Sequence, residues 1–428
     1  MFALAIFAGA LALLFLGFEM LLVLGLPGII SKELFFTHLP DVIYGQRMVG
    51  GINVNTLLAI PFFIFAAEIM SRGHIARHLT DVVKAFLGHR AGGLGHTTVG
   101  AAVAFGAVSG SAPATVAALG RILYPEMKAA GYSEKFSLGL LVSSAEVALL
   151  IPPSITLIIY AWLTGTSVAA LFAAGLVVGL FLAAAFSIYV VIDSRRHGRK
   201  RTTPMPYRER FRVLGRGAWA LGLPVVLMGG IYSGMFTATE AAAVSVVYAL
   251  FVECLIYRKL TWRDIGPIAN SAAITNAVIF ILLAMGSVVA YFITLAQVPT
   301  MVIDFMAVID ANWVVFLIIV NVLFLIAGMF IDPNSTLLIL VPALYPVAVN
   351  FGIDPIHFGI IICLNTCIGM ITPPFGLDIF VASSTLNEPV NKIIAGVWPF
   401  IVVNMLTLVV VTYVPDLSMF LPRLLLGH

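Results

Sequence analysis

Two polar clusters interrupt long apolar stretches of this sequence. The run SGSAPAT begins at Ser109, and IDPNST begins at Ile331. Each cluster places a proline directly after a small or acidic residue and surrounds it with hydroxyl, amide or carboxylate side chains. Oxygens of this kind suit a hard cation such as Na⁺, whereas the N-terminus of a helix that starts at such a proline favours a carboxylate. The clusters therefore indicate binding of a small cation and of an organic anion.

Two proline pairs lie in other apolar segments. IPPS begins at Ile151, and ITPPFG begins at Ile371. A proline inside a helix frees backbone carbonyls, so each pair predicts a broken helix that offers carbonyl oxygens. Alternatively, the prolines only kink their helices, and small residues only allow close packing, as at Gly175 and Gly179. The occurrence of clusters and breaks in two copies favours binding over packing alone.

The clusters and breaks belong to an internal repeat. The tripeptide LYP occurs at 123–125 and again at 344–346, an offset of 221 residues. The same offset pairs Gly131 with Gly352, Pro152-Pro153 with Pro373-Pro374, Ser111 with Asp332, and Thr115 with Thr336. An offset shared by so many matches predicts two copies of one fold.

The elements that must position these residues are apolar. The chain has 428 residues, of which 61% are hydrophobic and 10% are charged, whereas soluble domains carry about 25% charged residues. A helix needs about 20 apolar residues to cross a bilayer. Runs of this kind lie at 2–30, 51–70, 168–192, 237–257, 265–294 and 390–412. The sequence predicts an all-α polytopic membrane protein whose first run is a retained helix, because no basic segment precedes it.

The basic residues predict the orientation in the membrane. Nine of the 23 Lys and Arg residues lie between Arg195 and Arg216, and none lies between Asp264 and Asn391. Because basic loops stay in the cytoplasm, we assign 71–90, 193–216 and 258–264 to that side. A loop near anionic headgroups explains the run at 195–216 better than nucleic-acid binding does.

The flanks of the two clusters carry opposite charge. Basic residues flank the first cluster, and Asp304, Asp310 and Asp354 flank the second. We therefore expect two re-entrant hairpins, 93–127 and 312–350, which enter from opposite faces and turn at 109–113 and 330–335. Two copies of one fold in opposite orientation form an inverted-topology repeat, which is common in secondary transporters.

This interpretation divides the chain into five parts. They are a scaffold helix with an external segment (1–50), a first inverted repeat (51–192, with a broken helix at 133–163), a basic cytoplasmic loop (193–216), scaffold helices (217–264) and a second inverted repeat (265–428, with a broken helix at 356–384).

Several ionisable residues are further candidates, because a charge in an apolar segment is costly and usually functional. Glu146 precedes the first break and is expected to tune a cation site there. Glu68 and Glu240 are interpreted as structural, while Asp378 suits either role. Arg47 contacts an anionic substrate or anchors to headgroups. The candidate substrate residues are Arg47, Ser111, Ala112, Pro113, Pro374 and Asp378.

Known chemical motifs give no support for an enzyme. The histidines at 74 and 78 lack a neighbouring carboxylate ligand, and the three cysteines lie in apolar stretches, so neither set predicts a metal site. The sequence contains no HExxH, GxSxG, Walker A or GxGxxG pattern, which argues against an intramembrane protease or an ATPase.

Four segments resemble the large membrane subunit of tripartite ATP-independent periplasmic (TRAP) transporters. They are GINVNTLLAIPFFIFAAEIMSRG (51–73), AFGAVSGSAPATVAALG (104–120), LLIPPSI (149–155) and MITPPFGLDIF (370–380). The resemblance covers nearly the whole chain. It implies an elevator-type importer of organic acids, such as C4-dicarboxylates or sialic acid, in the bacterial inner membrane. It also implies a sodium gradient as the driving force, a periplasmic substrate-binding protein and a separate small four-helix membrane subunit.

The resemblance also implies two sodium sites, at 109–115 with 152–154 and at 332–336 with 372–376. The candidate ligands are Ser109, Gly110, Ser111, Thr115, Pro152, Ser154, Asp332, Asn334, Thr336, Thr372 and Gly376. The residues alone leave three alternatives open: a stand-alone ion-coupled anion carrier of the divalent-anion type, a channel, and an assembly scaffold. Neither of the last two has an evident need for two inverted hairpins.

Overall fold

A computed structural model describes residues 9, 12–13, 16, 18–199, 201 and 203–427. The regular elements of these residues are all helical. Among them, seven helices are long and apolar enough to cross a membrane: Asn55–Arg72, Val168–Arg196, Tyr207–Tyr232, Ala238–Ile256, Trp262–Leu295, Trp313–Phe330 and Val390–Tyr413. The predicted all-α class is confirmed.

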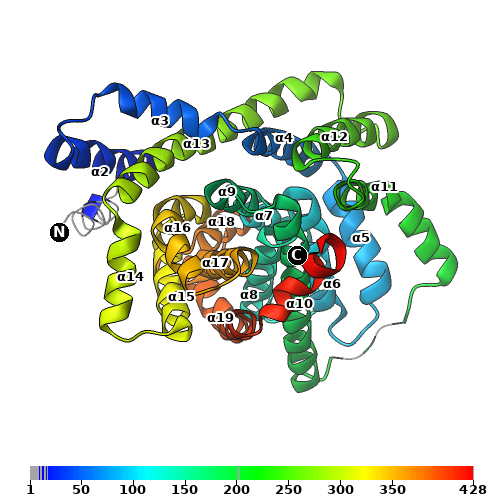
Figure 1. Cartoon of the computed structure of the whole chain (residues 1–428). Coiled ribbons are helices and arrows are strands. Elements are labelled where there is room, and N and C mark those ends of the chain that lie inside the picture. Colours follow the sequence, from blue (N-terminus) through cyan, green and yellow to red (C-terminus); the bar gives the residue numbers. More distant parts are fainter. Residues whose placement is uncertain are drawn as a thin grey trace.

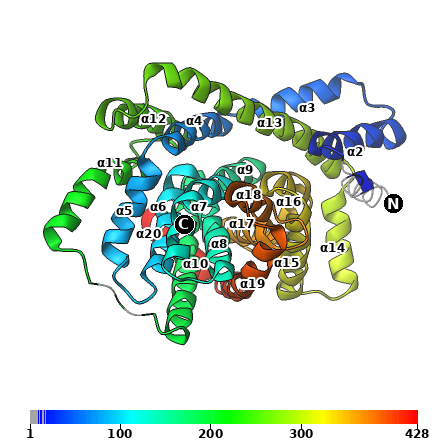
Figure 2. The same ribbon diagram turned by 180° about the vertical axis from the view of Figure 1, so that it is seen from behind.

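The helices form an outer frame and an inner bundle (Figure 1). The frame contains α2 (Met20–Phe35), α3 (Val42–Ile52), α4 (Ala59–Arg72), α11 (Tyr207–Tyr232), α12 (Ala238–Leu250) and α13 (Trp262–Leu295). The long helix α13 contacts α2, α3 and α4. Two helices, α5 (Ile75–Leu87) and α14 (Val298–Val308), join the frame to the bundle near its two ends, as the view from behind also shows (Figure 2).

The bundle is built from two helical hairpins and two broken helices. The hairpins are α6 (Gly93–Ser109) with α7 (Ala112–Ala129), and α15 (Trp313–Phe330) with α16 (Pro333–Asn350). The broken helices are α8 (Glu134–Ala145) with η2 (Glu146–Leu149) and α9 (Ile155–Thr164), and α17 (Pro355–Ile371) with α18 (Leu377–Leu386). Three further helices, α10 (Val168–Arg196), α19 (Val390–Tyr413) and α20 (Pro415–Leu426), complete it. Both halves of the chain therefore follow one order: frame helix, connecting helix, hairpin, broken helix and long helix.

Glycines bring each hairpin into backbone contact with a broken helix. A methyl group added at Gly106 of α6 would lie 2.7 Å from the Cα of Ala148 in η2. A methyl group added at Gly369 of α17 would lie 2.5 Å from the Cα of Gly328 in α15. Small residues permit such close approach of helices in membranes. The hairpins and the breaks are therefore packed as one body.

Helices extend into one predicted loop, and one predicted span lies partly outside the described residues. The basic segment 193–216 is mostly helical, because α10 continues to Arg196 and α11 begins at Tyr207. Arginine and lysine are good helix formers, so a dense positive charge does not by itself end a helix. The first predicted span, 2–30, lies partly outside the described residues, and its described helix, α2, begins at Met20.

The orientation of the two hairpins in the membrane stays a prediction. We expect residues 197–216 to face the cytoplasm and residues 350–354 to face the periplasm, because basic residues accumulate only in the first segment. Single cysteines at Thr203 and Asn350, both exposed positions, would then react with an impermeant thiol reagent from opposite sides of sealed vesicles. Labelling of both positions from one side would exclude the inverted repeat.

Candidate functional site

The first hairpin turns through two residues that leave the helical conformation. Gly110 ends α6 in the left-handed region with φ of 58°, and Ser111 is extended. The Ser111 Oγ accepts a hydrogen bond from the Ala114 N–H at 3.4 Å and caps α7. The Thr115 hydroxyl donates to the Ser111 carbonyl at 2.7 Å and lies 3.1 Å from the Ser109 Oγ. Hydroxyl and carbonyl oxygens are thereby gathered at the first tip.

The second hairpin turns through two extended residues, Ile331 and Asp332, and Asp332 caps α16. The Asp332 carboxylate accepts hydrogen bonds from the N–H groups of Asn334 at 3.0 Å and Ser335 at 3.2 Å. The Thr336 hydroxyl donates to the Asp332 carbonyl at 3.0 Å, the bond that Thr115 makes at the first tip. The two tips thus share a capped helix start and a threonine hydrogen bond, but only the second carries a charge.

The breaks in the other two helices lie against the tips. A methyl group added at Gly110 would lie 2.2 Å from the Pro153 carbonyl oxygen, so the first tip touches the first break. Both proline pairs contain a cis peptide bond. The Thr156 hydroxyl, just after the first break, donates to the Asn334 side-chain oxygen at 3.4 Å. This bond links the two halves of the repeat.

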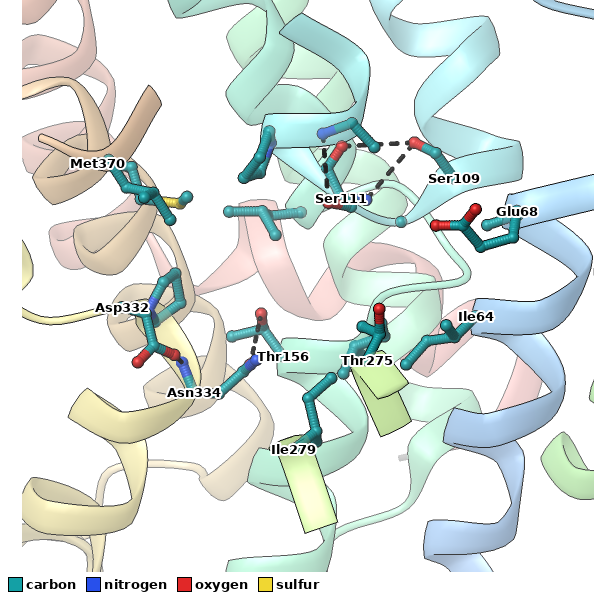
Figure 3. Close-up of a pocket in the computed structure, with 18 of the residues that line it drawn as sticks. Ile64, Glu68, Ser109, Ser111, Thr156, Thr275, Ile279, Asp332, Asn334 and Met370 are labelled. Atoms are coloured by element: carbon teal, nitrogen blue, oxygen red, sulfur yellow. Dashed lines mark hydrogen bonds between the residues drawn. The ribbon is translucent and has the colours of Figure 1, made fainter. Parts of the chain in front are cut away.

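A cavity of about 300 Å³ lies where the tips and breaks face the frame. Figure 3 shows Ser109 and Ser111 on one side, Asp332 and Asn334 on another, and Glu68 and Thr275 toward the frame. The bundle contributes Ser109, Gly110, Ser111, Pro113, Ala114, Leu149, Ile155, Thr156, Asp332, Pro333, Asn334, Met370 and Leu377, and the frame contributes Ile64, Ala67, Glu68, Ser71, Thr275 and Ile279. The cavity is therefore shared by the two bodies.

Six of the predicted site residues line this cavity: Ser109, Gly110, Ser111, Pro113, Asp332 and Asn334. Other predicted ligands lie behind its wall with their hydroxyls engaged. Thr115 and Thr336 bond to the tip carbonyls, Ser154 caps α9, and Thr372 donates to the Ile368 carbonyl at 2.6 Å. The buried residues Ala112, Pro152 and Gly376 also lie outside the lining.

Three candidate substrate residues lie away from the cavity. The Arg47 guanidinium stacks over the Tyr291 ring at 3.9 Å in the frame, an arrangement stabilised by cation–π attraction. Pro374 is exposed and does not line the cavity. Asp378 is fully buried inside the bundle. In this conformation the structure does not bring any of the three to the site.

Sequence reasoning did not identify the frame side of the cavity. Glu68, interpreted above as structural, lines the cavity, and its carboxylate lies 3.4 Å from the Arg72 Nε one turn along α4. Thr275 and Ile279 reach the cavity from α13. The apolar sequences of α4 and α13 do not indicate which face of each helix packs against the bundle. Only the packing of the frame could therefore identify these lining residues.

Several helices begin or end at the wall of the cavity. Four helices begin at its wall, namely α7, α9, α16 and α18, and α6, η2 and α17 end there. Helix N-termini present free N–H groups that suit a carboxylate, while C-termini present free carbonyls that suit a cation. None of the described lining residues is Lys or Arg. An anion in the cavity would thus have helix N-termini and neutral side-chain donors as its partners.

The sequence matches the family model described as "Tripartite ATP-independent periplasmic transporter, DctM component" over residues 7–417. The chain belongs to this family of TRAP transporter large permeases. The TRAP permease is 41% identical to the ectoine TRAP transporter large permease protein TeaC of Halomonas elongata, with 97% of each chain covered. It is 38% identical to the C4-dicarboxylate TRAP transporter large permease protein DctM of Rhodobacter capsulatus, covering 99% of this chain and all of that one.

Two further comparisons extend this result. The sialic acid TRAP transporter large permease protein SiaM of Vibrio cholerae is 37% identical over 90% of each chain. The crystal structure of the Alcanivorax borkumensis YdaH transporter aligns with a TM-score of 0.61, at 12% identity and 88% coverage of both chains, which shows a shared fold. The TRAP permease is thus a multi-pass protein of the inner membrane, as the seven apolar helices indicate.

Proposed function

We propose that this TRAP permease is the large subunit of a sodium-coupled secondary transporter that imports organic acids. The observation that carries the proposal is the convergence of both hairpin tips on one cavity. The relatives are named for ectoine, C4-dicarboxylates and sialic acid, and each of these compounds carries a carboxylate. Helix N-termini at the cavity suit that group.

Sodium would be held at the two tips by oxygens of this chain. At the first tip, Ser109, Thr115 and the nearby Pro153 carbonyl offer neutral oxygens. At the second, Asp332 offers a carboxylate, and the buried Ser335 Oγ has no hydrogen-bond partner among the described residues. We expect the substrate carboxylate nearer the first tip, because an anion directly beside Asp332 would be repelled.

Transport would proceed by movement of the bundle past the frame, as in an elevator mechanism. The cavity lies on the boundary between these bodies, so such a movement would expose it to one side of the membrane and then to the other. A periplasmic substrate-binding protein would deliver the acid, and a separate small four-helix membrane subunit would support the frame. The family name, which describes a tripartite periplasmic transporter, supports the proposal of two partners.

Uptake is expected to require a sodium gradient and no ATP. The permease would be reconstituted in sealed vesicles with its small subunit and a binding protein loaded with a radiolabelled carboxylate. An inward sodium gradient should drive accumulation, and collapse of the gradient should abolish it. Accumulation that survived the collapse but needed ATP would contradict the proposal. Accumulation without a binding protein would instead identify a stand-alone carrier.

A further inference from the structure

A second cavity lies where the loop between α5 and α6 meets the C-terminal end of α10. Its volume is about 430 Å³, and it shares no described lining residue with the cavity at the tips. Five basic side chains line it: His89, Arg90, His96, Arg195 and Arg201. They come from the α5–α6 loop, the start of α6, the end of α10 and the segment after α10. None of the described lining residues is acidic, so the cavity favours an anion.

Acidic residues close to this cavity have other basic partners. Asp193 of α10 carries a carboxylate oxygen 2.6 Å from an Arg199 guanidinium nitrogen. Glu126, which lines a neighbouring cavity, lies 2.6 Å from the Lys84 ammonium group. Within the described part of the chain, no ion pair includes any of the three arginines of the cavity, Arg90, Arg195 and Arg201. Their charges are therefore available to a ligand.

The donors that line the cavity suit a phosphate group. A guanidinium group can bind two phosphate oxygens at once through parallel charge-assisted hydrogen bonds. The Nδ1 atom of His89 is inaccessible to solvent and has no hydrogen-bond partner among the described residues. Buried polar atoms in proteins are normally hydrogen-bonded. An anion with several acceptor oxygens would meet the needs of the arginines and of this imidazole together.

The face of α10 that leads to the cavity favours a phospholipid over free phosphate. Ile188 and Ile192 are 62% and 42% exposed, and their spacing from Arg195 places all three residues on one face of the helix. Val191 lies next to this face and lines the cavity. Because α10 is long and apolar enough to cross a membrane, this face offers apolar side chains to acyl chains and an arginine to a headgroup.

We propose that this cavity binds the phosphate of an anionic phospholipid whose acyl chains lie along Ile188 and Ile192. Arg90 and Arg195 bind the phosphate oxygens by charge-assisted hydrogen bonds, and His89 adds an N–H donor. Basic pockets between membrane helices recognise anionic headgroups in this way. The lipid thereby joins the loop that follows the connecting helix α5 to the end of α10. The site is independent of the transported substrate and of the ion that drives transport.

Native mass spectrometry of the purified permease in detergent tests the site without measuring transport. The protein would be titrated with phosphatidylglycerol or with phosphatidylcholine of the same acyl chains. Wild type should bind phosphatidylglycerol more tightly. The variant Arg90→Gln/Arg195→Gln should bind it about 25-fold more weakly, because a basic residue beside an anionic headgroup contributes about fivefold in affinity.

The variant Arg208→Gln/Arg212→Gln is the matched control, because it removes the same charge from exposed positions of α11 that do not line the cavity. It should bind phosphatidylglycerol within about twofold of wild type. Equal weakening in both double variants would mean diffuse attraction and would overturn the site.

Two results with the wild-type protein alone would also overturn the proposal, so the test stands even where a variant fails to fold. One is equal affinity for the two lipids. The other is displacement of phosphatidylglycerol by inorganic phosphate at the same concentration, because the cavity would then be a site for a free anion.

Discussion

Replacing Asp332 with Asn is expected to raise the sodium concentration for half-maximal uptake about tenfold, a change of about 1.4 kcal/mol. The Asp332 carboxylate caps α16 through two backbone N–H groups and lines the cavity. Asn caps a helix about as well as Asp does, so the variant keeps the cap and loses only the charge. A charged partner typically contributes about 1.5–3 kcal/mol to such a contact. Uptake by vesicles across a sodium series measures the effect.

The chain supplies a matched control for this substitution. Asp354 caps α17 in the same manner, accepting from the N–H groups of Ile356 at 2.8 Å and His357 at 3.3 Å, and a proline follows it as one follows Asp332. It does not line the cavity. Asp354→Asn should leave the sodium dependence unchanged. If Asp332→Asn behaved in the same way, Asp332 would be only a cap, and the proposed inequality between the two tips would be wrong.

Replacing Gly110 with Ala is expected to reduce uptake at least tenfold. The added methyl group would lie 2.2 Å from the Pro153 carbonyl oxygen, which is backbone and has little freedom to move. Relief of this clash needs a shift of about 1 Å between the first tip and the first break, and misplacement of this size can cost on the order of 100-fold in rate at a positioned site. Initial uptake rates at saturating sodium would be compared at equal amounts of inserted protein.

The variant Gly131→Ala distinguishes the effect of this clash from the effect of backbone strain alone. Its φ of 77° is left-handed like that of Gly110, but a methyl group there would meet nothing within 4 Å. Alanine in this conformation costs roughly 1–2 kcal/mol at either position. Gly131→Ala should therefore lower stability slightly and keep uptake within about twofold of wild type. Equal losses in both variants would mean that strain, and not contact between tip and break, explains the defect.

Much of the bundle could be predicted because its signals are local. A Ser or Asp followed within two residues by proline marks the start of a helix, and the offset of 221 residues pairs Ser111 with Asp332. The structure gives the two residues the same capping role and gives Thr115 and Thr336 the same hydrogen bond. Capping depends on residues within one turn, so sequence alone contains the information.

The rest of the site depends on contacts between distant segments. The bond from Thr156 to Asn334 spans 178 residues, and Glu68 reaches the cavity only because α4 packs beside the bundle. Arg47 illustrates the same dependence on packing in the frame. A cation near an apolar segment suggests an anion site, but an aromatic ring of α13 provides its partner. Pairings of this kind arise from tertiary packing, which no short motif encodes.

The divided wall of the cavity has an evolutionary consequence. On the frame side, the hydroxyls of Ser71 and Thr275 donate only to carbonyls of their own helices, at 3.1 Å each, and take no part in building the tips. Mutations there would change the shape and polarity of the cavity while every hydrogen bond of the tips persists. Lineages could then change the transported compound by altering the frame wall and inherit the proposed ion-binding residues of the bundle wall unchanged. The different compounds named for relatives that are 37–41% identical to this chain accord with such a division.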